Sequence, residues 1–337
     1  FADRFDRKKL LMFFYVGFLC GTLWCGLART YEMLLAARIV TGLFGGVIGS
    51  VVLAIATDLF DARLRGRVMG VIQTAFGASQ VLGLPLGLAL SNQWDWHAPF
   101  IVLAVIGMLG IGVIALRMKP VDAHLGKQQE HSPFMHLWHT IAEPNHLLAF
   151  LTVTLLATGG FMLMPFSSAF LVNNVHIPLT HLPTIYFATG ICTIFVGPMV
   201  GKAADKLGRF NVFAFGSALT IAMVTIYTRL GPVPLPVIIA INITLFIGIF
   251  SRMIPFQALV SSVPEPTRRG AFNAISASLQ QLSGGLASLV AGHIVAHGPG
   301  GRIEHFPTVG YVVTGTTLVS MLLVWNIQKQ VQARAAK

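Results

Sequence analysis

Long apolar runs constrain this chain more than any other feature of its sequence. Runs of about 20 apolar residues, enough to cross a bilayer as a helix, recur along it between glycine, proline or charged residues. We predict ten spans, at 9–28, 31–56, 68–91, 98–116, 147–172, 180–201, 210–229, 235–260, 271–296 and 307–327. Only 10% of the residues are charged, whereas a soluble domain carries about 25%. The sequence therefore predicts an all-α polytopic membrane protein with the lipid bilayer as its main surroundings.

The basic residues are distributed unevenly between the two ends of these spans. Of the 23 Lys and Arg residues, only Arg29, Arg229 and Arg302 fall on one side, and Arg38 and Arg252 fall inside spans. All the others fall on the opposite side, which the positive-inside rule places in the cytoplasm together with both chain ends. The net charge of +11 thus reflects membrane orientation, and we expect no nucleic-acid partner. We expect an integral protein of the plasma (inner) membrane.

Motifs of catalysis and of metal or cofactor binding are absent from the sequence. The three cysteines are scattered through apolar runs, without the spacing of a disulfide framework or a metal site. No phosphate-binding loop, zinc-protease motif or nucleophile elbow occurs. We therefore expect neither an enzyme nor a bound metal or cofactor, although four histidines between 131 and 146 leave metal binding open beside an interfacial helix around Trp138.

A polar connection at 117–146 divides the predicted spans into two unequal groups. Residues 1–116 carry four spans and residues 147–337 carry six, with the connection on the cytoplasmic side. The opening "FADRFDRKK" is similar to the later "KAADKLGRF", with Asp3 matching Asp205 and Arg7 matching Arg209. Internal parallel repeats of this kind build a large class of transporters. Because the second copy has two spans before its acidic and basic loop, we expect two spans to be missing before the first.

Four stretches carry a resemblance to the major facilitator superfamily. "GKAADKLGR" resembles its loop signature Gly-x-x-x-Asp-basic-x-Gly-basic, and "FADRFDRKK" resembles a truncated copy with Asp6 in place of Gly. "RIVTGLFGG" resembles its Arg-centred fourth span, and "GLPLGLALSNQWDWHAPF" is similar to spans five and six of the drug and sugar efflux branch, with His97 replacing an Arg. The resemblance implies two pseudo-symmetric helical halves, of which this chain supplies spans three to twelve of twelve.

The loop signature implies a cytoplasmic gate. In the superfamily its carboxylate pairs with arginines and faces a helix N-terminus, which holds that side closed until the two halves rock. A simpler interpretation is that these charges only set the membrane orientation. The residues carried over to the gate are Asp3, Arg7, Arg65, Arg67, Asp205, Gly208, Arg209, Arg268 and Arg269.

Two arginines inside predicted spans are candidate functional groups. A charge within a span is costly and faces the bundle interior or water. Arg38 could act in coupling, or it could pair with Glu32 or extend its guanidinium toward the outer surface. Arg252 could attract an anion or take part in gating, or it could form an internal ion pair. The full set of candidates for the substrate cavity or coupling is Arg38, Gln73, Thr158, Asn242, Arg252, Gln257, Asn273, Gln280 and Gln281.

Glycine and proline mark predicted sites of helix packing and bending. Gly42, Gly45, Gly46 and Gly49 provide small-residue faces that suit close helix contact. Gly83, Pro85 and Gly87 bend or loosen their helix. The resemblance gives that stretch a role in efflux coupling, and a plain packing kink is the alternative.

We expect a monomeric secondary active transporter that exports small organic molecules, drugs or sugars, by proton antiport with alternating access. An ion gradient replaces any cofactor. Alternatives are a passive or substrate-coupled facilitator and, more remotely, an intramembrane enzyme or a non-transporting sensor or scaffold. No Asp or Glu lies in the middle of a predicted span, so we expect the coupling acid on one of the two missing spans.

Overall fold

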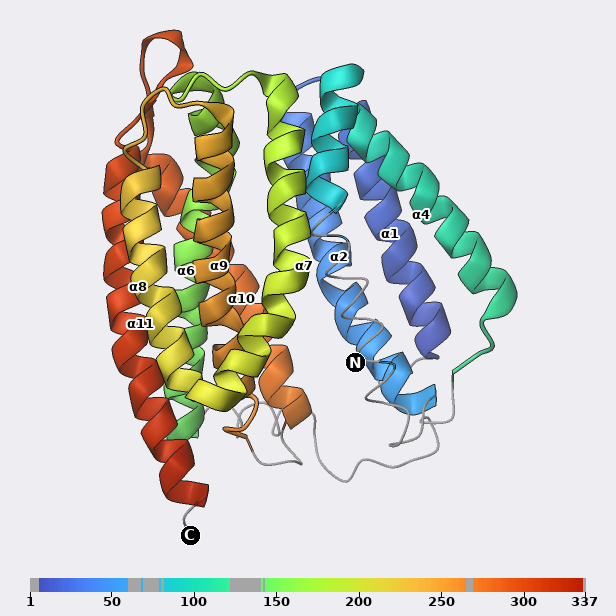
Figure 1. Cartoon of the computed structure of the whole chain (residues 1–337). Coiled ribbons are helices and arrows are strands. Elements are labelled where there is room, and N and C mark those ends of the chain that lie inside the picture. Colours follow the sequence, from blue (N-terminus) through green and yellow to red (C-terminus); the bar gives the residue numbers. More distant parts are fainter. Residues whose placement is uncertain are drawn as a thin grey trace. The chain divides into compact units, whose positions relative to one another are not determined.

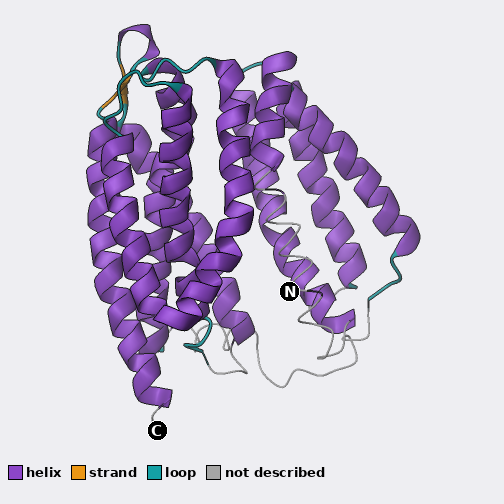
Figure 2. Ribbon diagram, viewed as in Figure 1, coloured by secondary structure: helices purple, strands orange, loops and turns teal. Residues whose placement is uncertain are grey.

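The computed structural model of the chain is almost entirely helical (Figure 2). It describes residues 6–59, 68, 79, 82–121, 141, 143–264 and 269–335. Eight of the described helices are long and apolar enough to cross a membrane. The predicted span at 271–296 forms a further helix with a more polar sequence, and most of the predicted span at 68–91 lies outside the described residues. The fold is that of an all-α polytopic membrane protein, as predicted.

The chain divides into two compact units, 1–130 and 131–337, and the division falls within the predicted connection. In the first unit, helix α1 packs against both α2 and α4 (Figure 1). The described elements are α1 (Arg7–Leu27), α2 (Tyr31–Leu59), a helical stretch at 82–93 and α4 (Ala98–Arg117).

The start of α1 is tied to the segment that follows α4. The Asp6 carboxylate caps α1 by accepting from the Lys8 N–H at 2.9 Å, and it also accepts from the Val121 N–H at 3.0 Å. Lys8 Nζ donates to the carbonyl oxygens of Ala115 and Met118. The predicted cytoplasmic connection therefore does not begin as a free loop at 117, because Arg117 still belongs to α4 and Val121 is buried.

Six long helices of the second unit are described, and they form a bundle. Helix α6 packs against α10 and α11, and α9 packs against α7 and α8 (Figure 1). Proline occupies one of the first two positions of α6, α7 and α9, where its missing N–H costs no helical hydrogen bond. The elements are α6 (Pro144–Asn173), η2 (Leu179–His181), α7 (Leu182–Leu207), α8 (Arg209–Tyr227), α9 (Leu235–Val260), α10 (Arg269–Ile294), β1 (Ala296–His297), η3 (Pro299–Gly301), β2 (Ile303–Glu304) and α11 (Phe306–Ala335).

An aromatic core joins five of these helices. Phe150 of α6 stacks on Phe272 of α10 with ring centroids 4.8 Å apart, and Phe213 of α8 lies 6.3 Å from Phe256 of α9. Val324 of α11 belongs to the same buried cluster. We call this buried core the Phe213 cluster.

A proline inside α6 is compensated by the neighbouring helix. Pro165 has no N–H, so the carbonyl of Phe161 lacks its usual donor four residues later. The Ser288 hydroxyl of α10 donates to that carbonyl at 3.1 Å. Close approach makes this possible, because a Cβ built on Gly284 would lie 2.8 Å from the Phe161 ring. The hydroxyl thus supplies a partner for the freed backbone group, as helices in lipid require.

A short hairpin between α10 and α11 is fastened to the end of α6. Strands β1 and β2 pair antiparallel, with Ala296 opposite Glu304. The Asn174 side chain donates to the Ile303 carbonyl at 2.9 Å and accepts from the Ile303 N–H at 2.8 Å. Asn173 donates to the Gly301 carbonyl at 2.8 Å. The hairpin is therefore held by side chains as well as by its own pairing.

Glycine permits two tight features around α8. Gly208 is the single residue between α7 and α8, and its φ of +91° strains any residue with a side chain. Farther along, a Cβ on Gly216 would lie 2.6 Å from the Cβ of Ser251, and one on Gly248 would lie 3.1 Å from the Thr220 backbone nitrogen. Helices α8 and α9 are therefore in backbone-close contact, as small residues allow in membranes.

Candidate functional site

The interior of α9 holds two strongly polar side chains. Asn242 is 3% exposed and Arg252 is 5% exposed, in a helix of mostly apolar residues. Arg252 Nε has no hydrogen-bond partner among the described residues. No carboxylate of the described residues forms an ion pair with Arg252. The internal ion pair considered from the sequence is therefore not found in the described part of the chain.

The other predicted cavity residues are less enclosed. Gln257, Asn273 and Gln281 are exposed and Gln280 is half-buried. The Thr158 hydroxyl donates to the Thr154 carbonyl of its own helix at 2.9 Å, so a local structural role accounts for it. Gln73 lies outside the described residues. Their assignment to a cavity stays a prediction.

Arg38 lies on an exposed part of α2. Its guanidinium carbon is 5.9 Å from the centroid of the Phe100 ring of α4, within reach of a cation–π attraction. Among the described residues no ion pair links Arg38 to Glu32. The contact with the Phe100 ring is therefore found in place of the predicted ion pair with Glu32.

The predicted gate is described only in part. Asp3, Arg65, Arg67 and Arg268 lie outside the described residues, as does the side chain of Arg269. Arg7 is buried at the beginning of α1, where its backbone N–H donates to the Val121 carbonyl at 3.1 Å.

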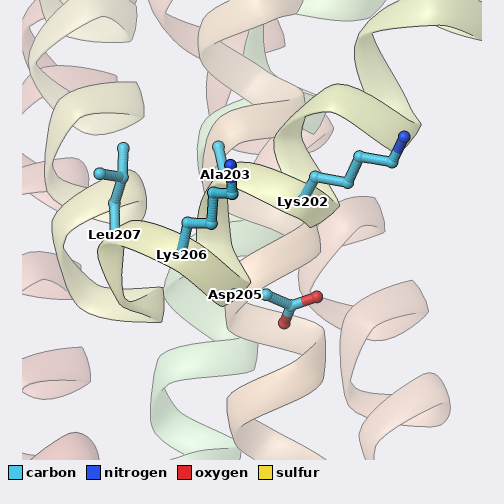
Figure 3. Close-up of a pocket in the computed structure, with 5 residues that line it drawn as sticks. All are labelled: Lys202, Ala203, Asp205, Lys206 and Leu207. Atoms are coloured by element: carbon cyan, nitrogen blue, oxygen red, sulfur yellow. The ribbon is translucent and has the colours of Figure 1, made fainter.

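The second copy of the loop signature forms the end of α7. Asp205 borders a shallow hollow with Lys202, Lys206 and their neighbours, and Figure 3 shows the two lysine side chains turned away from its carboxylate. Arg209 Nη1 donates to the Ala258 carbonyl at 3.1 Å and so links α8 to α9. Asp205 is exposed, and its gating role stays a prediction.

Of the glycines predicted to permit close helix contact in α2, Gly45 does so among the described residues, whereas Gly42, Gly46 and Gly49 do not. No described heavy atom lies within 4 Å of a Cβ built at Gly42 or Gly46. The close approach lies at Gly45, whose Cβ would be 2.9 Å from the Phe18 ring, and at Gly17, whose Cβ would meet the Phe44 ring. The sequence analysis did not single out Gly17, although a glycine amid bulky residues was a signal.

At the predicted bend, Gly83 and Gly87 differ from Pro85 in their surroundings. Within the described chain a Cβ at Gly83 or Gly87 would meet no heavy atom within 4 Å, whereas Pro85 is buried. The helix continues through all three residues. A role in bending or coupling stays a prediction.

The histidine that replaces an arginine of the motif forms a double contact before α4. His97 Nδ1 lies 2.5 Å from Asp95 Oδ2, and Nε2 lies 2.8 Å from the Ala28 carbonyl oxygen. Both oxygens accept hydrogen bonds, so the doubly protonated imidazolium satisfies both contacts. The Ala28 carbonyl, followed by the Asp95 side chain, raises the pKa of His97, and the hydrogen bond from His97 lowers the pKa of Asp95. This His97 clasp joins the α1–α2 turn to the start of α4.

Three hydroxyls that sequence analysis left out are buried without a partner. Ser217 Oγ, Ser276 Oγ and Thr317 Oγ1 have no hydrogen-bond partner among the described residues. A serine or threonine in an apolar run commonly bonds to its own helix, so the sequence offered no signal to separate these three.

Comparison with known proteins gives a family match across most of the chain. Residues 1–288 match the family described as Major Facilitator Superfamily. The uncharacterized MFS-type transporter YceJ of Bacillus subtilis is 23% identical over 333 residues, which cover 97% of this chain and 82% of YceJ.

Two similar proteins carry drug-related names over shorter alignments. Multidrug resistance protein 3 of Bacillus subtilis is 34% identical over 110 residues, covering 33% of this chain and 22% of that protein. Multidrug resistance protein fnx1 of Schizosaccharomyces pombe is 31% identical over 118 residues, covering 35% of this chain and 22% of fnx1. Both alignments leave most of the relative unmatched.

Proposed function

Because this chain belongs to the Major Facilitator Superfamily, we propose that it is a secondary active transporter that exports small organic molecules, drugs or sugars, across the plasma membrane. The proposal includes proton antiport by alternating access, with both chain ends in the cytoplasm. Export is favoured by the multidrug names of two similar proteins and by the efflux-type stretch at 83–100.

The observation that carries the transport proposal is the burial of Arg252 and Asn242 inside the membrane helix α9. A helix that only anchors or scaffolds gains nothing from an enclosed guanidinium, because burying an unpaired charge is costly. A transporter can use such a group to recognise a polar substrate.

The proposed cycle assigns different tasks to different ends of the helices. Asp205 and the basic residues near it hold the cytoplasmic side closed, and substrate binding releases that closure. Arg38 tunes the coupling acid by its positive charge, which an arginine keeps at physiological pH.

A facilitator that uses no proton gradient is the second candidate. It is favoured by the distribution of the 12 Asp and Glu residues, which all lie in loops or near span ends. Proton coupling usually needs a titratable group within the membrane.

Transport in everted vesicles tests these proposals. The full coding sequence that contains this chain is expressed, and uptake of fluorescent drug-like dyes and radiolabelled sugars is measured with and without an acidic vesicle interior. Uptake that requires the pH gradient supports proton-coupled export. Uptake that ignores the gradient supports the facilitator, and no uptake of any compound above that of empty vesicles contradicts transport of these classes.

A further inference from the structure

A polar layer lies one helical turn from the Phe213 cluster. Ser217 follows Phe213 by four residues in α8, Arg252 precedes Phe256 by four in α9, and Ser276 follows Phe272 by four in α10. Residues four apart share a helix face and are separated by about 6 Å along the axis. Since α9 runs opposite to α8 and α10 (Figure 1), all three steps lead in the same direction. The three polar residues therefore lie on the same side of the Phe213 cluster, each about one turn from it, and we refer to this region as the polar level.

The hydroxyls of this layer do not follow the usual pattern of the surrounding helices. Thr152, Thr220 and Ser320 each donate to the carbonyl four residues earlier in their own helix. Ser217 Oγ and Ser276 Oγ are buried and have no partner in the described part of the chain. Their hydrogens are thus free to bond to something that is not part of these helices.

Arg252 adds an unpaired charge to the same level. Its Nε is buried without a hydrogen-bond partner among the described residues, and the side chain is 5% exposed. Leaving such a donor unsatisfied is expensive, and leaving a guanidinium without a counter-charge is more so. The layer as described therefore lacks a negatively charged acceptor.

We propose that Arg252, Ser217 and Ser276 form a binding site for an oxyanion, the carboxylate or phosphate group of a small molecule. A guanidinium presents a planar fork of donors that matches both groups, and serine hydroxyls add neutral donors. The Phe213 cluster closes one side of this level with apolar rings. Identifying the oxyanion with part of the transported substrate rests on the proposed transport function, whereas binding itself does not.

Anion-dependent thermal stability tests the site without any transport measurement. The purified full-length protein is titrated with inorganic phosphate or with acetate, each against sodium chloride of equal ionic strength, which controls for general salt effects. We expect a saturable rise in Tm with at least one of the two anions. A response to phosphate alone points to phosphorylated compounds, and a response to acetate points to carboxylates.

Variants place the site within the fold. Arg252→Gln removes the saturable rise, and Ser217→Ala or Ser276→Ala weakens the anion affinity roughly tenfold, as expected for one hydrogen bond to a charged group. Arg229→Gln is the matched control, because Arg229 lies exposed at the end of α8 with its own partners, Thr225 and Tyr311. It keeps the full response.

The anion-free stability of Arg252→Gln gives a second readout. Removing an unpaired buried charge leaves Tm unchanged or raises it, whereas removing one partner of a structural pair lowers it strongly. The proposal is overturned by a wild-type protein with no saturable response, by an unaltered response in Arg252→Gln or in both serine variants, or by a collapse of Tm in anion-free Arg252→Gln. Transport is tested separately by the vesicle assay, so failure of the anion site and failure of transport are distinguishable.

Discussion

The substitution Ser288→Ala tests how a membrane helix tolerates an internal proline. The Phe161 carbonyl in α6 cannot bond to Pro165, and it accepts from Ser288 Oγ at 3.1 Å. The same hydroxyl lies 3.0 Å from the Gly284 carbonyl, so its one hydrogen is shared between two acceptors. Side-chain hydrogen bonds between membrane helices contribute about 0.6 kcal/mol on average and up to about 1.7 kcal/mol. With a shared hydrogen, we expect Ser288→Ala to cost about 0.5–1 kcal/mol.

A double-mutant cycle isolates the contribution of the hydrogen bond from Ser288 to the Phe161 carbonyl. In Pro165→Ala the restored N–H can bond to Phe161, so adding Ser288→Ala should then cost close to nothing. The free energy of unfolding is measured for all four proteins by titration with denaturing detergent. Ser320→Ala serves as the control, because its buried hydroxyl donates to Thr316 in its own helix and should not couple to Pro165. A coupling energy between Pro165 and Ser288 below about 0.3 kcal/mol, the usual limit of additivity, would refute the reasoning.

Four further predictions follow from other contacts. The His97 clasp requires the imidazolium, whose pKa is raised. Its stabilising effect is therefore complete below about pH 6.5 and is lost as the pH rises through the raised pKa. The difference in Tm between wild type and His97→Gln should shrink over that range, and a constant difference would contradict the prediction. Gly248→Val should lower Tm strongly and reduce insertion yield, because its Cβ would lie 3.1 Å from a backbone nitrogen of α8, whereas an unchanged Tm would show that the helices separate easily. Asn174→Ala removes two hydrogen bonds to the hairpin and should cost about 1–2 kcal/mol, with faster proteolysis at 296–304 as the direct measurement. If Asp205 belongs to a gate, Asp205→Asn should slow transport at normal membrane insertion, and normal kinetics would reduce it to an orientation signal.

The helical spans were predictable because lipid leaves the backbone few choices. Long apolar runs must satisfy every N–H and carbonyl internally, and α9 begins and ends at the residues expected, Leu235 and Val260. The start of α6 at Pro144 was missed by three residues, because His146 reads as polar yet is buried beside the Phe272 ring. Composition cannot reveal such a contact.

The partners of individual side chains were much less predictable. Arg252 stood out because a charge in an apolar run is rare, but nothing in the sequence distinguished Ser217 from Thr220 three residues later. The first has no partner among the described residues and the second donates to its own helix. Likewise Gly42 and Gly45 look equivalent in "RIVTGLFGG", and only the rotation of α2 about its axis decides that Gly45 contacts α1. These differences depend on tertiary packing, which a single sequence does not show.

The single-residue joint at Gly208 has a mechanical consequence for any movement of the second unit. Helix α7 ends at Leu207 and α8 begins at Arg209. The connection of one residue is therefore too short to let the two helix ends move apart. The two helices can change their mutual angle through the two dihedrals of Gly208, but their joined ends cannot slide apart. Since Arg209 also bonds to the Ala258 carbonyl of α9, the pivot is anchored to a third helix. Any change in the angle between α7 and α8 is therefore a rotation about this point, in which the far ends of the two helices travel the greatest distance.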